Sequence, residues 1–492
     1  MWVALLPVIA AVGREDGVAY IMESMPTELP LAAIPGTRST AEVLTSWTNE
    51  ARHKIDVTAM YWSLLKNVSD PGNRNFTAEQ YEHFGRDKGV GLFEALRAAA
   101  KRGVQIRVLG GAGISSDERG KEIDVIIEEY PSKVALQLYN ASAWYPGGIM
   151  HQKFWIFDTD RAVVTSANMD WLSLAQVKEL GVAVDDRPDS ELVADLQKYF
   201  DRWWVFTDPK LPPCKKSLYD RANGAAREVP CFSQLYGAHD TMPSPFHDSL
   251  DTEYNLDHQM KLKLNGTTGG TFLSCSPPEL CDSRTAVDSR YQHSPPGRQW
   301  DGDALSQTIL SAHDSVSLSV MDFSPTSYYE DATGVWWELL SDALVTKIRA
   351  GTNVRVLISR WAHSDKRMFE FLRTMNTTAQ FCANAAGDRA GTFAIRLFEV
   401  PGWEKTTGPD ADYPAFSRVN HAKYIVTDNR FNIGTSNMEW SYFFDTAGTS
   451  FNSDHAGLRK QVQAIFDRDW NSPFAVPLKT VIDPIDGVPS LV

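Results

Sequence analysis

The chain has 492 residues, of which 43% are hydrophobic and 22% charged, and it carries a formal net charge of -14 at pH 7. This composition is that of an ordered globular protein, and the length favours two or three domains over a single core. The acidic balance excludes broad electrostatic capture of nucleic acid on a basic face, while a narrow basic site remains compatible with it.

The apolar N-terminal stretch, residues 2–13, is too short to span a bilayer and lacks a basic leader. We expect it to be a degenerate signal segment or what remains of a trimmed membrane anchor. Five Asn-x-Ser/Thr sequons could accept glycans in the secretory pathway. They are Asn67, Asn75, Asn140, Asn265 and Asn376.

The chain contains five cysteines and no Cys-x-x-Cys pair. A zinc ribbon or a thioredoxin-like site is therefore not expected. Disulfides are compatible with the sequence, and the odd count leaves at least one thiol over.

The first half of the chain predicts alternating strands and helices. A short strand within 19–29 ends in a Pro-containing turn, and 39–62 and 91–111 each show helix-period apolar positions followed by a strand-like run. The helix within 91–111 is closed by Gly103, a residue type common at helix ends. This half closes on residues 151–171, HQKFWIFDTDRAVVTSANMDW.

The second half repeats this series in the same order. Residues 270–280 match the first strand, and 303–323 and 334–361 match the two helix–strand units, the second with Gly351 at its helix end. Residues 421–440, HAKYIVTDNRFNIGTSNMEW, match the closing motif. The chain therefore contains an internal duplication.

Alternating elements with apolar strands predict an α/β fold of two pseudo-symmetric lobes, each a central sheet flanked by helices. We place the first lobe at 17–205 and the second at 256–480. Residues 206–255 between them are rich in Pro, Ser, Asp and Gly, which predicts a linker or an irregular excursion.

Both closing motifs have the form His-x-Lys-x4-Asp. Strand alternation points the histidine and the lysine of each motif to one face. A single motif could be a strand with charged ends whose aspartate forms a turn. Two copies in register with the internal repeat indicate a catalytic site instead. Its predicted residues are His151, Lys153, Asp158, His421, Lys423 and Asp428.

These side chains suit phosphoryl transfer. A neutral imidazole can attack a phosphodiester to give a phosphohistidine, and a second, protonated imidazole can protonate the leaving oxygen. The lysines would stabilise the charge on the non-bridging oxygens, and this reaction requires no metal and no cofactor. Further predicted phosphate-binding residues are Ser166, Asn168, Thr435 and Asn437.

Each histidine also needs an acceptor that fixes its tautomer. Two downstream carboxylates, Glu179 and Asp445, stand at suitable spacing. For both, a carboxylate at the surface or at a helix start is an equally good interpretation.

The doubled motif, with the Ser/Thr-x-Asn that follows each copy, resembles the signature of the phospholipase D superfamily. The chain is most similar to the animal lysosomal branch, members three and four, which are five-prime exonucleases of single-stranded DNA and RNA. This likeness rests on HQKFWIFD, SANMDW, QVKELGV, VNHAKY, IGTSNMEW, TAGTS and RDWNSP.

The resemblance implies two phospholipase D-like lobes with one active site at their interface. It also implies a path through phosphohistidine, with His151 as nucleophile and His421 as general acid; the pseudo-symmetry leaves the reverse assignment open. The expected location is lysosomal, the lumen of another endomembrane compartment, or secreted.

The chain departs from the superfamily signature at two positions. Thr165 stands where glycine is usual, and its β-branched side chain is expected near backbone that should approach phosphate. Thr435 stands where serine is usual. Asp428, in contrast, matches the superfamily, whereas the animal branch carries Glu there. We expect these changes to tune the site and to leave its chemistry intact.

Three functions stay open from the sequence. The first is a five-prime exonuclease, and the second is a phospholipase D or phosphatidyl transferase on glycerophospholipids, including synthesis of bis(monoacylglycero)phosphate. The third is a catalytically silent binding protein. The expected partner is a single-stranded nucleic acid or a phospholipid, and a homodimer is compatible with the sequence. Candidates for base stacking, a role that core packing rivals at each position, are Trp62, Trp144, Tyr145, Trp171, Trp361 and Trp440.

Overall fold

A computed structural model describes residues 16–65, 76–111, 121–141, 144–145, 147–186, 190–211, 213–220, 225–231, 248–282, 297–327 and 335–478. The N-terminal stretch 2–13 and the sequons at Asn67 and Asn75 lie outside these ranges. Within them, no helix has both the length and the apolar character that a membrane crossing requires.

The first lobe is built on an eight-stranded mixed sheet in the order β2-β1-β10-β8-β7-β3-β5-β6. Neighbours β3, β5 and β6 are parallel, whereas β10, β8 and β7 form an antiparallel series. The strands of this sheet are β1 (Val18–Ser24), β2 (Arg38–Ser39), β3 (Lys54–Ala59), β5 (Gln105–Gly111), β6 (Val134–Tyr139), β7 (Phe154–Phe157), β8 (Arg161–Thr165) and β10 (Glu179–Asp185). The short strands β4 (Trp62–Ser63) and β9 (Met169–Asp170) pair beside it.

The second lobe repeats this arrangement in a sheet of order β13-β14-β21-β20-β19-β16-β17-β18-β22, with β15 paired to β14. Its strands are β13 (Met260–Leu264), β14 (Thr267–Ser276), β15 (Gln299–Trp300), β16 (Ser315–Val320), β17 (Asn353–Ser359), β18 (Phe393–Phe398), β19 (Tyr424–Thr427), β20 (Phe431–Gly434), β21 (Gly448–Ser453) and β22 (Ala475–Pro477). From β14 to β18 the order of this sheet matches β1 to β6 of the first, so the predicted pair of pseudo-symmetric α/β lobes is confirmed.

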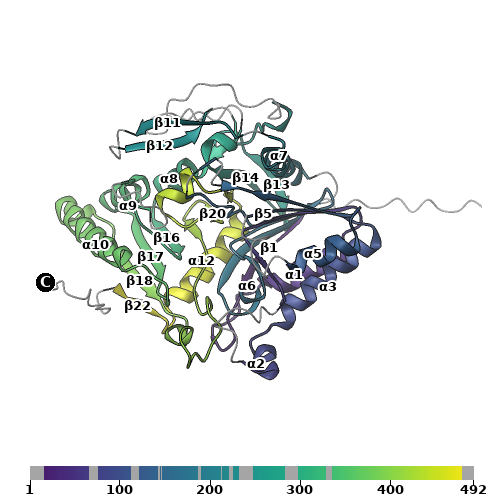
Figure 1. Cartoon of the computed structure of the whole chain (residues 1–492). Helices are drawn as coiled ribbons and strands as arrows, with labels where there is room; N and C mark the ends of the chain where they lie inside the picture. Colours follow the sequence, from purple (N-terminus) through teal and green to yellow (C-terminus); the bar gives the residue numbers. More distant parts are fainter. Residues whose placement is uncertain are drawn as a thin grey trace, which may run out of the picture.

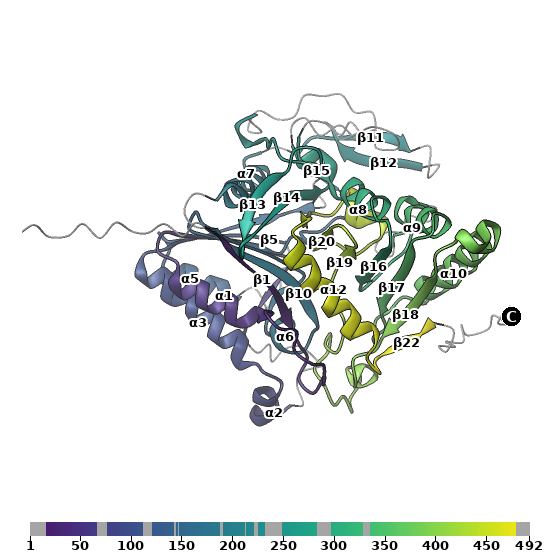
Figure 2. The ribbon, with the colours of Figure 1, turned by 180° about the vertical axis from the view of Figure 1, so that it is seen from behind.

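Amphipathic helices cover the outer faces of the two sheets (Figure 1, Figure 2). The first sheet carries α1 (Thr40–Glu50), α3 (Asp87–Arg102) and α5 (Lys121–Glu129), and the second carries α8 (Asp301–Leu310), α9 (Leu339–Arg349) and α10 (Lys366–Ala386). As predicted, α3 ends at Gly103 and α9 is followed by Gly351, both with a left-handed φ, 98° and 99° respectively. Shorter helices are α2 (Ala78–His83), α6 (Trp171–Ala175) and α11 (Trp440–Phe444).

Two helices lie between the sheets and join the lobes. The apolar cluster that contains the buried faces of α7 (Glu191–Phe206) and α12 (Ala456–Trp470) draws residues from both sheets (Figure 2). A buried ion cluster adds to this interface: Lys178 Nζ lies 2.7 Å from Asp469 Oδ2, and Arg468 pairs with Glu23 at 2.6 Å. Buried ion pairs of this kind gain little net stability, but both pairs cross from one lobe to the other.

The region between the lobes, predicted as a linker or irregular excursion, contains a two-stranded antiparallel hairpin, β11 (Lys215–Asp220) and β12 (Ala225–Pro230). A disulfide between Cys214 and Cys231 closes its base, and a second disulfide joins Cys275 to Cys281. Cys382 is the thiol left over.

Candidate active site

The two motif histidines meet where the lobes meet, and each is fixed by backbone from the opposite lobe. His151 N–H donates to Ala447 O at 3.1 Å, and His421 N–H donates to Lys178 O at 2.8 Å. The residues just before them form matching bridges, Met150 with Ala447 and Asn420 with Lys178. The two imidazole rings are 6.4 Å apart, centroid to centroid. One site is therefore assembled from both halves.

Each motif lysine lies beside its histidine. Lys153 Nζ donates to His151 O at 3.0 Å, and Lys423 Nζ donates to His421 O at 2.6 Å. Both lysines are buried, and burial lowers the pKa of each, that of Lys423 to about 8. Two buried lysines favour the binding of an anion beside them, because a nearby negative charge stabilises their charged forms.

The motif aspartates lie at the other ends of their strands and do not line the site. The Asp158 carboxylate accepts from the backbone N–H groups of Arg52, His53 and Lys54, where β3 begins. The Asp428 carboxylate does the same for the segment 313–315, where β16 begins. This placement corrects the sequence-based assignment of the two aspartates to the catalytic set, because each acts on backbone and positions a strand.

The predicted phosphate-binding residues lie in the turns after β8 and β20, where their side chains are already engaged. Asn168 Nδ2 donates to Tyr61 Oη at 3.0 Å, and Asn437 Nδ2 donates to Asp322 Oδ2 at 2.8 Å. Their side-chain oxygens make no hydrogen bond with any described residue.

Tyr61 and Asp322 were missed by the sequence reasoning. Both come directly after a repeated strand, in AMYW (59–62) and VMDF (320–323). Aligning the two repeats would have shown that they hold equivalent positions.

The hydroxyls of the two turns are also engaged. Ser166 Oγ donates to Glu179 Oε2 at 2.5 Å, and Thr435 Oγ1 accepts from Thr449 N–H at 3.0 Å. Ser166 therefore links the first turn to the carboxylate beside His421.

Thr165, whose β-branched side chain was expected near backbone that approaches phosphate, has room in the sheet. Its cross-strand neighbour is Gly181, and a Cβ on Gly181 would lie 2.7 Å from Thr165 Cβ. In the second lobe the same pair is reversed, with Gly434 opposite Ser450. In the first lobe the glycine of this pair therefore lies on β10, the strand that faces the motif.

Glu179 is the carboxylate that contacts a motif histidine. Both of its oxygens lie 2.9 Å from His421 Nδ1. Burial raises the pKa of Glu179, but the charges of His421 and Lys423 and its hydrogen bonds outweigh burial and lower it. Glu179 is therefore ionised and fixes a proton on His421 Nδ1.

Asp445 does not hold the equivalent place, and the expectation for it is corrected. The strand β10 begins at Glu179 and β21 begins at Gly448, so a glycine is the counterpart of the glutamate. Asp445 lies three residues earlier, at the end of α11, where its N–H donates to Ser441 O. His151 Nδ1 makes no hydrogen bond with any described residue.

The pKa values of the two histidines are shifted by different neighbours. Burial lowers the pKa of His421 to about 4, with Glu179 opposing the shift and Lys423 adding to it. Burial, and then the charges of Lys153 and Lys423, lower the pKa of His151. The Glu179 carboxylate therefore favours the protonated form of His421.

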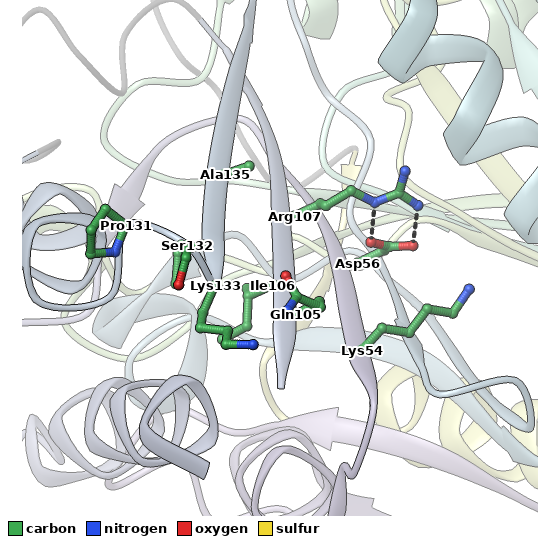
Figure 3. A pocket seen from close by; sticks show the side chains of 10 residues that line it. Lys54, Asp56, Gln105, Ile106, Arg107, Pro131, Ser132, Lys133 and Ala135 are labelled. Atoms are coloured by element: carbon green, nitrogen blue, oxygen red, sulfur yellow. Dashed lines mark hydrogen bonds and ion pairs between the residues drawn. The ribbon is translucent and has the colours of Figure 1, made fainter. Parts of the chain in front are cut away.

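A cavity of about 370 Å³ opens onto both histidines. The polar and aromatic residues of its lining include His151, His421, Glu179, Trp361, Phe416 and Tyr442. A second hollow of about 410 Å³ lies at the opposite ends of β3 and β5, around Lys54 and Arg107, and contains no motif residue (Figure 3). Within the described ranges, no three His, Cys, Asp or Glu side chains are grouped to hold a metal ion.

Comparison with known proteins covers nearly the whole chain. Residues 48–204 match the family described as cardiolipin synthase, PLD-like domain, and residues 231–402 match the PLD3/4, PLD-like domain. The chain is 30% identical over 473 residues to 5'-3' exonuclease PLD3 of Rattus norvegicus, covering 95% of this chain and 82% of that protein. It is 31% identical over 465 residues to "Probable phospholipase D F09G2.8" of Caenorhabditis elegans, covering 94% and 71%.

Among solved structures, the phosphatidylserine synthase of Haemophilus influenzae Rd KW20 has a similar fold. The TM-score is 0.50 at 11% identity, and the match covers 91% of this chain and 88% of that one. The match to the rat PLD3 protein, at 30% identity, covers 82% of that protein, and two lobes bring two histidines to one cavity. The chain therefore belongs to the phospholipase D superfamily, in its PLD3/4-like branch, and is a phosphodiesterase of that superfamily.

Proposed function

We propose that the protein is a metal-independent five-prime exonuclease of single-stranded DNA and RNA that acts through a phosphohistidine. The observation that carries the chemistry is the pair of imidazoles 6.4 Å apart in one cavity, flanked by two buried lysines. The relatives named 5'-3' exonuclease PLD3 support the choice of substrate and of cleavage polarity.

In this proposal His151 is the nucleophile. Its lowered pKa keeps the ring neutral, so Nε2 can attack phosphorus while the bond from phosphorus to the leaving oxygen breaks. His421 delivers the proton to that oxygen, because the Glu179 carboxylate stabilises its imidazolium form. Water then attacks the phosphohistidine as His421 takes back the proton, and His151 is released as the neutral imidazole.

The phosphate itself supplies the charge that the site lacks. A phosphodiester anion among Lys153, Lys423 and the two histidines raises the pKa of each of these groups. The lysines then neutralise the charge on the non-bridging oxygens as the transition state forms. His421 consequently becomes protonated when substrate is bound.

The cavity mouth favours a flat, aromatic substrate group. Phe416 lines the cavity with half of its side chain exposed, at 50%. Its ring stacks on that of His363, with centroids 4.7 Å apart and an interplanar angle of 15°, and His363 in turn contacts Trp361. Phe416 also has a left-handed φ of 58°, a strained state that persists where the surroundings enforce it. An exposed ring held at such cost suits stacking on a nucleobase.

A phospholipid is the second candidate substrate. It is favoured by the apolar part of the cavity wall, where Leu172, Val177, Met321 and Val419 lie beside the histidines. The same two histidines would then transfer a phosphatidyl group to water or to an alcohol.

We further propose a lysosomal or other endomembrane lumen as the location. The two disulfides support it, because disulfides persist in oxidising compartments.

The test is incubation of purified protein with EDTA, at pH 4.5 to 8, with oligonucleotides labelled at either end and with phosphatidylglycerol vesicles. We expect stepwise release of mononucleotides from the five-prime end, lost in His151→Ala and in His421→Ala. Headgroup transfer without nucleotide release would select the lipid alternative. Loss of activity with EDTA would overturn the metal-independent mechanism, and inactivity on both substrates would support a silent binding protein.

A further inference from the structure

Each lobe has a carboxylate at one of two equivalent positions, the start of a strand or the start of a helix, and the two lobes use different ones. In the first lobe β10 begins at Glu179 and α1 begins at Thr40. In the second lobe β21 begins at Gly448 and α8 begins at Asp301. The strand position is acidic in one lobe, and the helix position is acidic in the other.

The register of the sheets supports this equivalence. Glu179 is paired with Ser24, the last residue of β1, and Gly448 is paired with Ser276, the last residue of β14. A second such difference involves glycine: it lies on β10 in the first lobe, as Gly181 opposite Thr165, and on β20 in the second, as Gly434 opposite Ser450.

The space at Gly448 explains why no side chain stands there. A Cβ on Gly448 would lie 2.3 Å from Ser276 Oγ, 2.4 Å from Ser436 Oγ and 3.4 Å from Asp301 Oδ2. A glutamate therefore has no room at this position. Asp301 brings a carboxylate to the same place from the helix side, with its Oδ1 held by Ser274 Oγ at 2.6 Å.

Three buried polar atoms around this place make no hydrogen bond with any described residue: His151 Nδ1, Ser436 Oγ and Asp301 Oδ2. His151 N–H donates to Ala447 O, just before Gly448, as His421 N–H donates to Lys178 O, just before Glu179. Gly448 therefore stands to His151 as Glu179 stands to His421, and Ser436 Oγ occupies the place of the missing side chain. Buried polar atoms without partners cost free energy, and a rotated hydroxyl or one water joins such groups where two or more are close. The three atoms can therefore form one chain of hydrogen bonds.

We propose that Asp301 is the positioning residue of His151, acting through Ser436 or a bridging water. It accepts the hydrogen-bond chain that starts at His151 Nδ1–H, which leaves the Nε2 lone pair free to attack phosphorus. This inference rests on the proposed function. Glu179 contacts His421, the general acid, directly. Asp301 acts on His151, the nucleophile, through an intervening group, so its charge has the weaker effect.

The experiment compares Asp301→Asn with Asp303→Asn, a matched change in the first turn of the same helix. We expect Asp301→Asn to lower kcat about tenfold with little change in KM, since second-sphere partners of this kind contribute 10- to 100-fold. Removing the charge also lowers the pKa of His151, so the acidic limb of the pH profile moves to lower pH. The cationic groups that face His151 are Lys153, Lys423 and His421, and all are kept in both variants.

A second measurement does not depend on activity. Nitrogen-15 shifts of labelled histidine, with His151 assigned from a His151→Gln variant, report which ring nitrogen carries the proton. We expect the Nδ1–H tautomer in the parent protein and a mixture in Asp301→Asn. An unchanged tautomer and an unchanged pH profile in folded Asp301→Asn, or equal effects in Asp303→Asn, would overturn the inference. Absence of phosphodiesterase activity in the parent protein would instead count against the proposed function.

Discussion

The carboxylate of Glu179, in the first lobe, hydrogen-bonds Nδ1 of His421, in the second, with both oxygens at 2.9 Å. The contact is buried, and it joins an acid and a base that are 242 residues apart in the chain. Neither lobe by itself contains the pair. The protonation of the site therefore depends on how the two sheets are held against each other.

The first prediction concerns Glu179→Gln. The negative charge of Glu179 raises the pKa of His421, so without it this pKa falls further below its usual value and less imidazolium is present at a given pH. We expect kcat/KM to fall about 10- to 100-fold and the alkaline limb of its pH profile to move to lower pH. Glu50→Gln, which removes a carboxylate that pairs with Arg161 at the surface, is the control. An unshifted alkaline limb would count against His421 as the general acid.

The second prediction separates the roles of the histidines by leaving group. A p-nitrophenolate leaves without a proton, so a general acid matters little for a p-nitrophenyl phosphodiester. We expect His421→Ala to lose about 100- to 10,000-fold of activity on an oligonucleotide and far less on the activated ester. His151→Ala should be inactive on both, because no phosphohistidine forms. Stopped-flow assays of both variants measure this difference. The opposite pattern would make His421 the nucleophile.

The third prediction is that Asp428 stabilises the fold and has no direct part in the reaction. Asp428→Ala removes the acceptor of three backbone N–H groups at the start of β16. We expect the free energy of unfolding to fall by roughly 1–2 kcal/mol, a range reduced because this carboxylate is partly exposed to solvent. Urea unfolding and kcat at low temperature measure the two effects. A large loss of kcat in a stably folded variant would restore Asp428 to the catalytic set, and Asp388→Ala, on the surface, is the control.

The same group has a defined pH dependence. Burial opposes ionisation of Asp428, but its backbone hydrogen bonds outweigh burial and lower its pKa from 3.8. A lowered pKa in the folded state means that the stabilisation is present above pH 3.8 and is lost as the pH falls through the lower, folded-state value. The stability difference between the parent protein and Asp428→Ala should therefore shrink in strong acid.

The fourth prediction concerns the cysteines. Denatured but unreduced protein should take up one equivalent of iodoacetamide, at Cys382, and non-reducing peptide maps should contain the other two pairings. Replacing Cys275 and Cys281 together by serine should lower the free energy of unfolding by about 2 kcal/mol, the value expected for so short a loop. Labelling of a second cysteine would contradict the assignment.

The sequence predicted the duplication, the α/β lobes and the motif residues because these are local patterns repeated in order. Apolar periodicity and helix-end glycines depend on neighbours in the chain. Tyr61 and Asp322 were not predicted, although they hold equivalent positions in the repeat, because their hydrogen bonds to Asn168 and Asn437 exist only in the folded chain.

The sequence pointed to Glu179, which contacts His421, but it did not predict the roles of the other acidic residues. Asp158 and Asp428 stand close to the histidines in the motif, yet a strand carries each to the far end of the sheet, where backbone N–H groups bind it. Asp445 stood at a suitable spacing, but the strand register places Gly448 at the position of Glu179. Spacing along a chain does not report which end of a strand a side chain occupies.

By itself, the sequence determined that two copies of one α/β unit carry two histidines and two lysines suited to a phosphodiester. Only the tertiary structure decided that the copies are unequal: Glu179 contacts His421 directly, whereas Gly448 holds the equivalent place and His151 Nδ1 has no hydrogen-bond partner among the described residues. The physical reason is that hydrogen bonding and desolvation, which set the protonation of each imidazole, depend on distances of about 3 Å between the lobes, and no local pattern encodes those distances.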